Sequence, residues 1–569
     1  MQASSCRCLR RTSVESQSAD ACGVSRALRH TDQLFDILEQ VHALLIDLHQ
    51  NNPPSHLEAD VIIIGAGAVG LTMGVELARS GARVLLLEAG GSSVTSESQA
   101  FFNSARAIGR PLEGLHLGRF RALGGSTTFW GGQLAALEPL IYRYRPWVAD
   151  AVWPIGDADV APYYGRLFSL LGMDQQIADD AEVWRRIRVL PPEVTPDLEY
   201  FFTRWVPEAN FARLFAAEIR RSQMLSVAVN APVTALQTDA SGRRVTQVEI
   251  RGAGKAVTVA RAAAFVMAAG AIETPRLLLF NLANGQAAPW SRNPWLGRGF
   301  MDHLECKAAI VTPVDRRRFH NIFDNVVLDG IKYQPKFKLS EQAQVSRRLL
   351  SISAQFTFNS SISEHISNAK IFFKGVLRGK FDLNILKYPA QLASLVRFSA
   401  PMIGRYLRDH RVYNLADRGI DLELSVEQRP IASSAVLLRS DRDALGMPMI
   451  DLDWKVDGGE IETFASFTEL VGEYLVRNGL ASLEIAPGLL QRDASYLTNV
   501  RDTFHHIGTT RMSLDPESGV VDANLKVHGT DNLFVAGAGV YPTGGFQNPT
   551  FTAMALGIRL ADTLRRTKA

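Results

Sequence analysis

A short run of consecutive apolar residues, Val61–Ile64, leads into a glycine-rich turn and then into a helical pattern that extends to Ser80. Continuous apolar runs of this length are typical of strands that are buried on both faces of a parallel sheet. A second apolar run, from Arg83 to Leu87, ends in Glu88. This order predicts a strand–helix–strand unit of a doubly wound α/β domain.

Other patterns divide the rest of the chain. Apolar residues recur at helical spacing from Thr31 to His49, which predicts a helix that the Asn51–Pro54 segment ends. Residues 1 to about 30 are polar and lack periodicity, so we expect a disordered tail. Further strands are predicted in a β-rich segment at about 226–268 and in alternating patterns at Leu349–Phe358, Leu422–Val426 and Ala435–Leu438.

The segment from Ile362 to His410 is predicted to be helical and is markedly basic. Three interpretations remain open: a lid over the active site, a face that docks on a membrane surface or a partner, and an ordinary solvated surface. A weak membrane-surface association through residues 362–411 would suit an enzyme that passes electrons to a membrane acceptor.

Composition excludes several classes of function. The net charge of the 569 residues is only +3, which gives no reason to expect a nucleic-acid partner. No run of about twenty apolar residues predicts a membrane-spanning helix. Neither the four cysteines nor the 12 histidines show the spacing of a metal site. We therefore expect a cytoplasmic protein, peripheral to a membrane at most, without a metal.

The glycine-rich turn has the spacing of a dinucleotide-binding fingerprint. Gly65 permits the tight turn, Gly67 lets the backbone approach a pyrophosphate, and Gly70 lets the helix pack closely on the strand. The helix N-terminus offers free N–H groups to that pyrophosphate. Glu88 is placed to accept hydrogen bonds from the ribose hydroxyls. These residues predict a dinucleotide site.

The identity of the dinucleotide depends on further segments. Gly74 and Gly81 extend the glycine spacing toward that of FAD-binding proteins, although NAD stays open on this motif alone. Strands that end in small residues at Ala264–Gly270 and Asn532–Gly539 would let backbone lie against a long, flat ligand. Together they favour FAD.

Four ordered segments, which span about residues 58–566, resemble the glucose–methanol–choline (GMC) oxidoreductase family. They are the fingerprint from Asp60 to Gly90, the glycine-rich loop Arg121–Thr127, the segment Gly270–Leu278, and His505–Met512 with Asn548–Thr550.

The resemblance implies roles for residues that the patterns alone do not assign. His505 corresponds to the active-site His of the family, and Asn548 corresponds to its partner near the flavin. Val233 should meet the adenine through its backbone. Gly124, Gly125 and Ser126 should line the pyrophosphate or the flavin.

Two departures qualify this resemblance. Gly537 stands where many members have Asp, and the segment from Asn532 to Thr552 looks more like pyranose oxidases, which favours sugars as substrates. His506 stands where many members have Pro, so it is a second candidate for the base. The loop Ser126–Trp130 lacks the His through which pyranose oxidases can attach flavin, so we expect non-covalent FAD.

The chemistry expected is oxidation of a CH–OH group: a His that acts as a base near neutral pH removes the hydroxyl proton, and flavin N5 takes the hydride. We expect a sugar, glycoside or polyol as substrate. Gln428 at a strand end is a candidate for substrate contact, as is His506, and Trp130 is a candidate for flavin contact. His303 and His320 are expected to be structural.

Alternatives to this function stay open: a choline- or sterol-like alcohol as substrate, a lyase on the same scaffold, a non-catalytic flavoprotein or interaction module, and an NAD-dependent enzyme. The electron acceptor (oxygen, a quinone or a redox protein) is undetermined. The predicted fold is α/β: a Rossmann-like FAD-binding domain from discontinuous segments and an α+β substrate-binding domain with a β-sheet. The expected boundaries are a tail and helix at 1–57, an FAD domain at 58–145, 226–300 and 500–566, and a substrate domain at 146–225 and 301–499.

Overall fold

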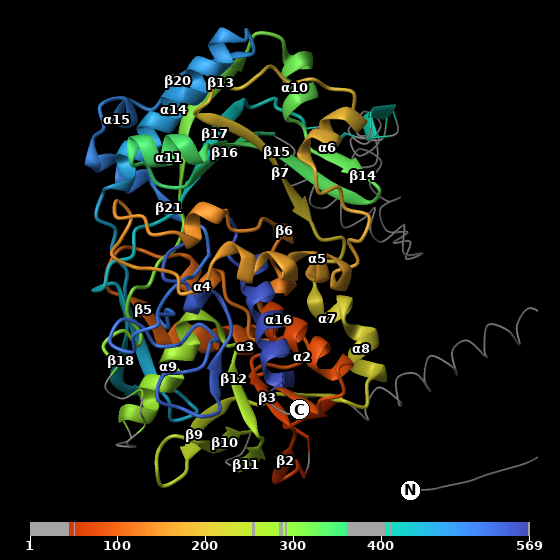
Figure 1. Cartoon of the computed structure of the whole chain (residues 1–569), viewed down its shortest axis with the longest axis vertical. Coiled ribbons are helices and arrows are strands. Elements are labelled where there is room, and N and C mark those ends of the chain that lie inside the picture. The colour runs from red at the N-terminus through yellow and green to blue at the C-terminus, as the bar shows by residue number, and fades with distance from the viewer. Residues whose placement is uncertain are drawn as a thin grey trace, which may run out of the picture.

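The computed structural model describes residues 45–566 apart from residues 51, 253–256, 284–287, 289, 291–292, 361–403, 407, 410 and 413. Two bodies lie one above the other in Figure 1, each built on its own large sheet. Mixed helices and sheets confirm the predicted α/β class.

The lower body contains a six-stranded sheet in which every neighbouring pair is parallel. All four residues of its central strand from Val61 to Ile64 are buried, as the continuous apolar run predicted. In sheet order the strands are β1 (Leu45–Asp47), β8 (Leu225–Val229), β4 (Val84–Leu87), β3 (Val61–Ile64), β12 (Ala264–Met267) and β22 (Leu533–Val535).

The edge strand β1 corrects one prediction. Leu45–Asp47 was expected at the end of a helix, but it pairs in parallel with Val227–Val229 of β8. Pairing with an open sheet edge satisfies the backbone of these three residues, and this non-local contact outweighs the local apolar periodicity. The remainder of the predicted helix and the predicted tail lie outside the described residues.

The upper body is a nine-stranded sheet whose neighbours are all antiparallel. The predicted strands at Leu349–Phe358 and Leu422–Val426 are confirmed within it. Its strands are β20 (Ala481–Ile485), β13 (Leu304–Pro313), β17 (Ile420–Val426), β16 (Ile352–Phe358), β15 (Ile331–Leu339), β7 (Leu198–Trp205) and β6 (Gln133–Leu134), with β14 (Val326–Leu328) on β15 and β21 (Arg501–Asp502) on β13.

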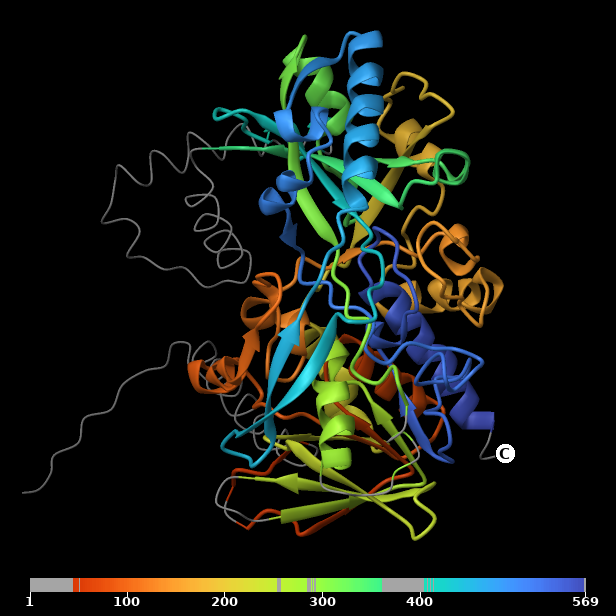
Figure 2. The same ribbon diagram turned by 90° about the vertical axis from the view of Figure 1, so that its left-hand side faces the viewer.

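Two smaller sheets flank the lower body, and Figure 2 shows the four-stranded one at its base. The predicted strand at Ala435–Leu438 is confirmed in the other. The four-stranded sheet contains β2 (His56–Glu58), β11 (Val257–Arg261), β10 (Val245–Arg251) and β9 (Val233–Thr238), and the three-stranded sheet contains β18 (Ala435–Arg442), β19 (Pro448–Asp453) and β5 (Ala105–Ala107).

Helices cover the outer faces of both large sheets. In the lower body α2 (Ala68–Arg79) packs beside α16 (Thr550–Arg566), and α14 (Glu460–Arg477) lies across the upper sheet. The other described helices are α3 (Ser96–Ala100), α4 (Gly114–Leu117), α5 (Ala161–Leu170), α6 (Asp180–Arg186), α7 (Phe211–Leu214), α8 (Ala216–Arg221), α9 (Gly270–Ala283), α10 (Arg316–Phe323), α11 (Glu341–Arg347) and α15 (Pro487–Leu490).

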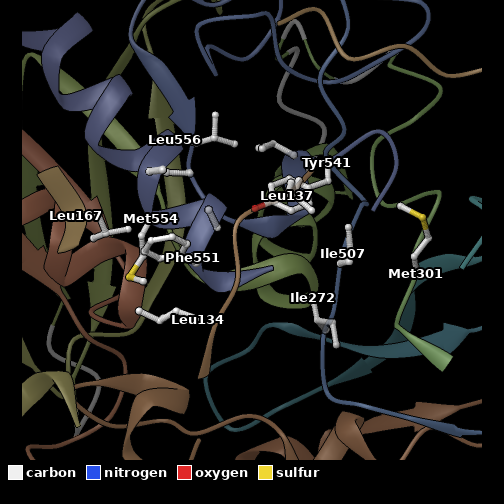
Figure 3. Packing of buried hydrophobic residues seen from close by; sticks show 14 of the residues in the cluster. Leu134, Leu137, Leu167, Ile272, Met301, Ile507, Tyr541, Phe551, Met554 and Leu556 are labelled. Carbon is white, nitrogen blue, oxygen red and sulfur yellow. The ribbon is translucent and has the colours of Figure 1, made fainter. Parts of the chain in front are cut away.

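One continuous set of buried apolar side chains fills both bodies. Figure 3 shows Phe551 and Met554 of α16 beside Leu167 of α5, so the C-terminal helix is held from two sides. This packing fixes the N-terminal end of α16, which follows directly on Asn548 and Pro549.

The six-stranded sheet draws its strands from three separate parts of the chain, and most of the upper sheet is inserted between the second and third. This order agrees with a discontinuous domain, although the boundaries stay a prediction. Most of the basic segment 362–411 lies outside the described residues. Within the described residues, no helix combines the length and apolarity that crossing a membrane requires.

Candidate functional site

The turn between β3 and α2 requires glycine at two positions. Gly65 has a φ of +109°, and a Cβ on it would lie 2.6 Å from the carbonyl oxygen of Ala268. A Cβ on Gly70 would lie 2.0 Å from the carbonyl oxygen of Gly65. The helix therefore approaches the strand only because these positions carry no side chain.

Gly67 in the same turn faces open space, since a Cβ on it would meet no other atom within 4 Å. This space is a cavity of about 350 Å³, here called the nucleotide cavity. It lies where β3, β4, β12 and β22 end, the edge of a parallel sheet at which ligands bind. Residues that directly follow these four strands line it: Gly65, Glu88, Ala268 and Ala536.

Glu88 is buried at the wall of the nucleotide cavity. Its carboxylate accepts hydrogen bonds from the backbone N–H of Ala66 at 3.1 Å and of Gly90 at 2.9 Å. Burial raises the pKa of Glu88 to about 7, against the opposing effect of these N–H groups and of Arg121. The two bonds fix the carboxylate, which keeps lone pairs for further donors such as ribose hydroxyls.

The loop near the predicted flavin position lies against this turn. Gly124 donates its N–H to the carbonyl oxygen of Ala66 at 2.9 Å and does not line the cavity, so its position supports the loop. The indole of Trp130 donates to Ala209 at 2.7 Å and faces the cavity. Other predicted cofactor residues that line the nucleotide cavity are Gly125, Ser126, Val233 and Gly537.

A second cavity of about 310 Å³, here called the substrate cavity, lies against the upper sheet. His505 and Phe504 line both cavities. Asn548 lines the substrate cavity, whereas its neighbours Pro549 and Thr550 line the nucleotide cavity. His505 therefore lies at the boundary between the two spaces.

Both ring nitrogens of His505 have partners. Nε2 lies 3.0 Å from Nδ2 of Asn548. Nδ1 lies 2.8 Å from Oγ1 of Thr503 and 3.0 Å from Nδ1 of His303. Asp302 anchors this arrangement, because its Oδ1 accepts from the backbone N–H of His505 at 2.9 Å and from Oγ1 of Thr503 at 3.0 Å.

These contacts favour one tautomer of His505. Oδ1 of Asp302 accepts the backbone N–H groups of Thr503 and His505, so this oxygen carries no proton. In its contact with the Thr503 hydroxyl it can therefore only accept, and the hydroxyl proton of Thr503 points to it. The Thr503 oxygen is then free to accept Nδ1–H of His505. Nε2 consequently carries the lone pair and faces Asn548.

Electrostatics keep His505 neutral. Burial and, to a lesser extent, the positive charge of Lys336 lower the pKa of His505 to about 4. Near pH 7 one nitrogen of its imidazole is therefore unprotonated. This is the state that a proton acceptor needs.

His506 is separated from the substrate cavity. It lines the nucleotide cavity only, and burial lowers its pKa to about 3. Its Nε2 lies 3.8 Å from Oδ2 of Asp302. Position therefore favours His505 over His506 as the base, and it gives no support to the predicted substrate contact of His506.

Gln428 does not line either cavity, contrary to the candidate role in substrate contact. It is 2% exposed, and its Oε1 accepts from the backbone N–H of Asp302 at 3.0 Å and from the indole of Trp454 at 2.9 Å. Its amide donates to the carbonyl oxygen of Lys455 at 2.5 Å. The side chain of a Gln at a strand end can point into the protein or into a cavity, and the sequence pattern does not distinguish these two orientations.

His303 was expected to be structural, yet its ring lies directly against His505. His320, by contrast, bonds Asp324 at 2.9 Å and stacks on Phe358, away from both cavities. Among the residues that the structure describes, no cluster of three His, Cys, Asp or Glu side chains forms a metal site.

Sequence reasoning missed Thr503, Asp302 and Lys336. Thr503 stands two residues before His505, where a hydroxyl can reach the ring, and this spacing was an available signal. Lys336 belongs to the alternating apolar and polar residues of Ile331–Leu339, a strand pattern that was not used. Asp302 had no local signal, because the fold alone brings it to the His505 segment.

Comparison with known families agrees with this geometry. Residues 60–297 match the model described as "FAD dependent oxidoreductase", and residues 430–557 match the C-terminal model described as "GMC oxidoreductase". The first range contains the glycine turn and Glu88, and the second contains His505 and Asn548.

Individual relatives match this chain at low sequence identity. The chain is 26% identical over 347 residues to the fructose dehydrogenase large subunit of Gluconobacter japonicus, which is 59% of this chain but only 53% of that protein. It is 22% identical to 2-methyl-1,2-propanediol dehydrogenase of Mycolicibacterium austroafricanum, over 90% of this chain and 95% of the relative.

The fold is similar to that of pyridoxine 4-oxidase from Mesorbium loti, with a TM-score of 0.56 and 17% identity over 89% of this chain and 99% of that structure. At this identity the likeness concerns the fold alone. The two family matches together identify an FAD-dependent oxidoreductase whose C-terminal region is similar to that of GMC oxidoreductases.

Proposed function

We propose that this protein uses non-covalent FAD to oxidise a CH–OH group of a sugar, glycoside or polyol. The observation that carries the proposal is the position of His505. Its ring lies between the nucleotide cavity and the substrate cavity, and the lone pair on Nε2 faces Asn548.

The nucleotide cavity fits FAD in several respects. Gly67, Gly270 and Gly537 line it, and a Cβ on any of them would meet no other atom within 4 Å, so side chains there would enter the cavity. Glu88 would hold the ribose, and the turn before α2 would hold the pyrophosphate. When bound, FAD supplies N5 of its isoalloxazine ring as the hydride acceptor.

Non-covalent binding is supported by the cavity wall. A covalent link requires a nucleophilic side chain beside the ring. No Cys or Tyr lines the nucleotide cavity among the described residues. Of the two His that line it, His505 is the proposed base, and Nε2 of His506 lies 3.8 Å from Oδ2 of Asp302. Cys306 is buried elsewhere, and burial raises the pKa of its thiol.

The residues of the chain would handle the proton. Nε2 of His505 takes the proton of the substrate hydroxyl, while Nδ1–H stays bonded to Thr503. The amide of Asn548 donates to the same hydroxyl oxygen and so fixes it beside the base. The substrate would thus lose a proton and a hydride and become a carbonyl compound, with bound FAD as the group that supplies the hydride acceptor.

The walls of the substrate cavity support a polyhydroxylated substrate. Hydroxyl and amide side chains on adjoining strands can each donate and accept, which suits sugar hydroxyls. Fructose dehydrogenase and 2-methyl-1,2-propanediol dehydrogenase, by their names, act on such hydroxyl compounds. These side chains are Gln133, Thr203, Ser353, Gln355 and Ser425.

The test is to mix the purified yellow protein anaerobically with sugars, glycosides, polyols, choline and sterols. We expect an uncharged sugar or polyol to bleach the flavin absorption and to give a carbonyl product. Bleaching by choline or sterols alone would move the substrate to another class. Product formation without bleaching would indicate a lyase.

The base is tested by His505→Ala. General-base catalysis contributes roughly 10²–10⁴-fold, so turnover should fall by at least that lower value while FAD stays bound. His506→Ala is the matched control and should lose much less. Equal losses in both variants would remove the assignment of His505. The class of the electron acceptor and a membrane-surface association through residues 362–411 stay predictions.

A further inference from the structure

The strand β15 alternates apolar and polar residues along its whole length. The apolar side chains are buried, and the polar ones lie on the opposite face of the sheet. Four polar side chains therefore share the face that the substrate cavity adjoins. They are Lys332, Gln334, Lys336 and Lys338.

Three of these four have partners within the protein. Lys332 lies over the ring of Trp205 at 3.7 Å. Gln334 accepts from the amide of Gln133 at 2.9 Å. Lys338 pairs with Glu138 at 2.5 Å.

Lys336 is different. It lines the substrate cavity and has no hydrogen bond or ion pair with any residue that the structure describes. An ammonium group carries three N–H donors. Lys336 is half-buried, so these donors are available to a ligand in the substrate cavity.

Two carboxylates attract the charge of Lys336 but make no hydrogen bond or ion pair with it. Burial lowers the pKa of Lys336 to about 8, while Glu305 and Glu423 oppose that effect. Arg501 already contacts both carboxylates. Thr357 also donates to Glu423 at 2.7 Å. Lys336 consequently stays charged near pH 7, and its N–H groups remain available.

Lys336 also acts on the base. Besides burial, the charge of Lys336 also lowers the pKa of His505. Lys336, His505 and Asn548 all line the substrate cavity, so a substrate bonded to His505 shares this space with the positive charge.

We propose that Lys336 contacts the substrate: its ammonium donates to a hydroxyl oxygen of an uncharged polyhydroxylated compound and excludes alcohols that carry an ammonium group beside the reacting carbon. This inference rests on the proposed function and narrows its substrate class. Two unit positive charges about 4 Å apart repel strongly at the effective dielectric constant of a protein. The carboxylates that line the same cavity, Glu113, Glu305, Glu423 and Asp502, offset part of this repulsion, so roughly 100-fold discrimination is expected.

The test uses pairs of compounds that differ in charge: D-glucose with D-glucosamine, and sorbitol with choline. Binding is followed by the change that each compound causes in the flavin absorption of the holoenzyme, and turnover is measured in parallel. The wild type should bind the uncharged member of a pair about 100-fold more tightly. Lys336→Met should weaken binding of the uncharged member and bring the two affinities within about threefold.

Lys332→Met is the matched control, because it removes the same charge from the same strand and face but away from the substrate cavity. It should keep the discrimination of the wild type. Lys336→Arg keeps the charge and should keep most of the discrimination, which separates the effect of charge from that of misfolding.

Equal binding of both members of each pair by the wild type would overturn the inference, and so would wild-type affinities in Lys336→Met. Failure of every uncharged compound to bind would also overturn it. The proposed function fails in another way, when no alcohol bleaches the flavin or when His505→Ala keeps full turnover. The two failures are therefore distinguishable.

Discussion

The nucleotide cavity and the substrate cavity are built in opposite ways. In the first, the wall at the ends of the parallel strands is formed by backbone, because glycines remove side chains there. The second is formed by polar side chains on the face of an antiparallel sheet. A backbone-built site suits a constant ligand such as a dinucleotide, whereas a wall of side chains can change its specificity by single substitutions.

The largest effect is expected where the backbone leaves no space. Gly70→Ala would place a Cβ 2.0 Å from the carbonyl oxygen of Gly65, so the turn must open. Overpacking typically costs about 1–3 kcal/mol, and FAD affinity should fall roughly 5- to 150-fold. Titration of the apo-protein with FAD, followed by flavin fluorescence, measures this change.

Gly165→Ala is the matched control for that substitution. Gly165 lies inside α5, and a Cβ on it would meet no other atom within 4 Å. FAD affinity should not change, and the helix should gain slightly in stability. If Gly70→Ala bound FAD as tightly as Gly165→Ala, the close approach of α2 to β3 would not matter for the cofactor.

The second prediction concerns the substrate cavity, where Thr503 is expected to set the tautomer of His505. Thr503→Val keeps the shape but removes the oxygen that accepts Nδ1–H. Loss of this bond should lower kcat about tenfold, because part of the His505 population then carries its proton on Nε2. FAD content should stay at the wild-type value.

Nitrogen-15 NMR of labelled histidine distinguishes the two tautomers directly. Thr503→Ser restores the hydroxyl and should restore both the tautomer and most of kcat. A Thr503→Val protein with the tautomer and kcat of the wild type would show that another group, such as His303, orients the ring.

The two cavities also differed in how far the sequence predicted them. The nucleotide cavity depends on residues close together in sequence, Gly65 to Glu88, so spacing alone indicated the turn, the helix and the acid. The site of His505 was predicted by resemblance to a family. Its partners Asp302 and Thr503 were not predicted. Asp302 is 203 residues from His505 in sequence and only the fold brings them together, whereas the two-residue spacing of Thr503 was a signal that was not used.

The errors have the same physical origin. Leu45–Asp47 forms an edge strand because β8 offers it backbone partners. Gln428 turns inward because Trp454 and the backbone of Asp302 bind it there. In each case a contact distant in sequence decided the outcome, and local periodicity carries no information about such contacts.

The last prediction concerns the pH dependence of FAD binding in the nucleotide cavity. Glu88 accepts ribose hydroxyls best as a carboxylate, and burial raises its pKa to about 7 in the protein without ligand. Binding of FAD must therefore release a proton at acidic pH, and the dissociation constant should rise about tenfold from pH 8 to pH 6. Glu88→Gln cannot titrate and should bind FAD more weakly at pH 8 but with little dependence on pH. Because the N–H groups of Ala66 and Gly90 hold the carboxylate in place, a flat pH profile in the wild type would mean that these two bonds keep Glu88 ionised throughout this range, and that the backbone controls the charge of this side chain.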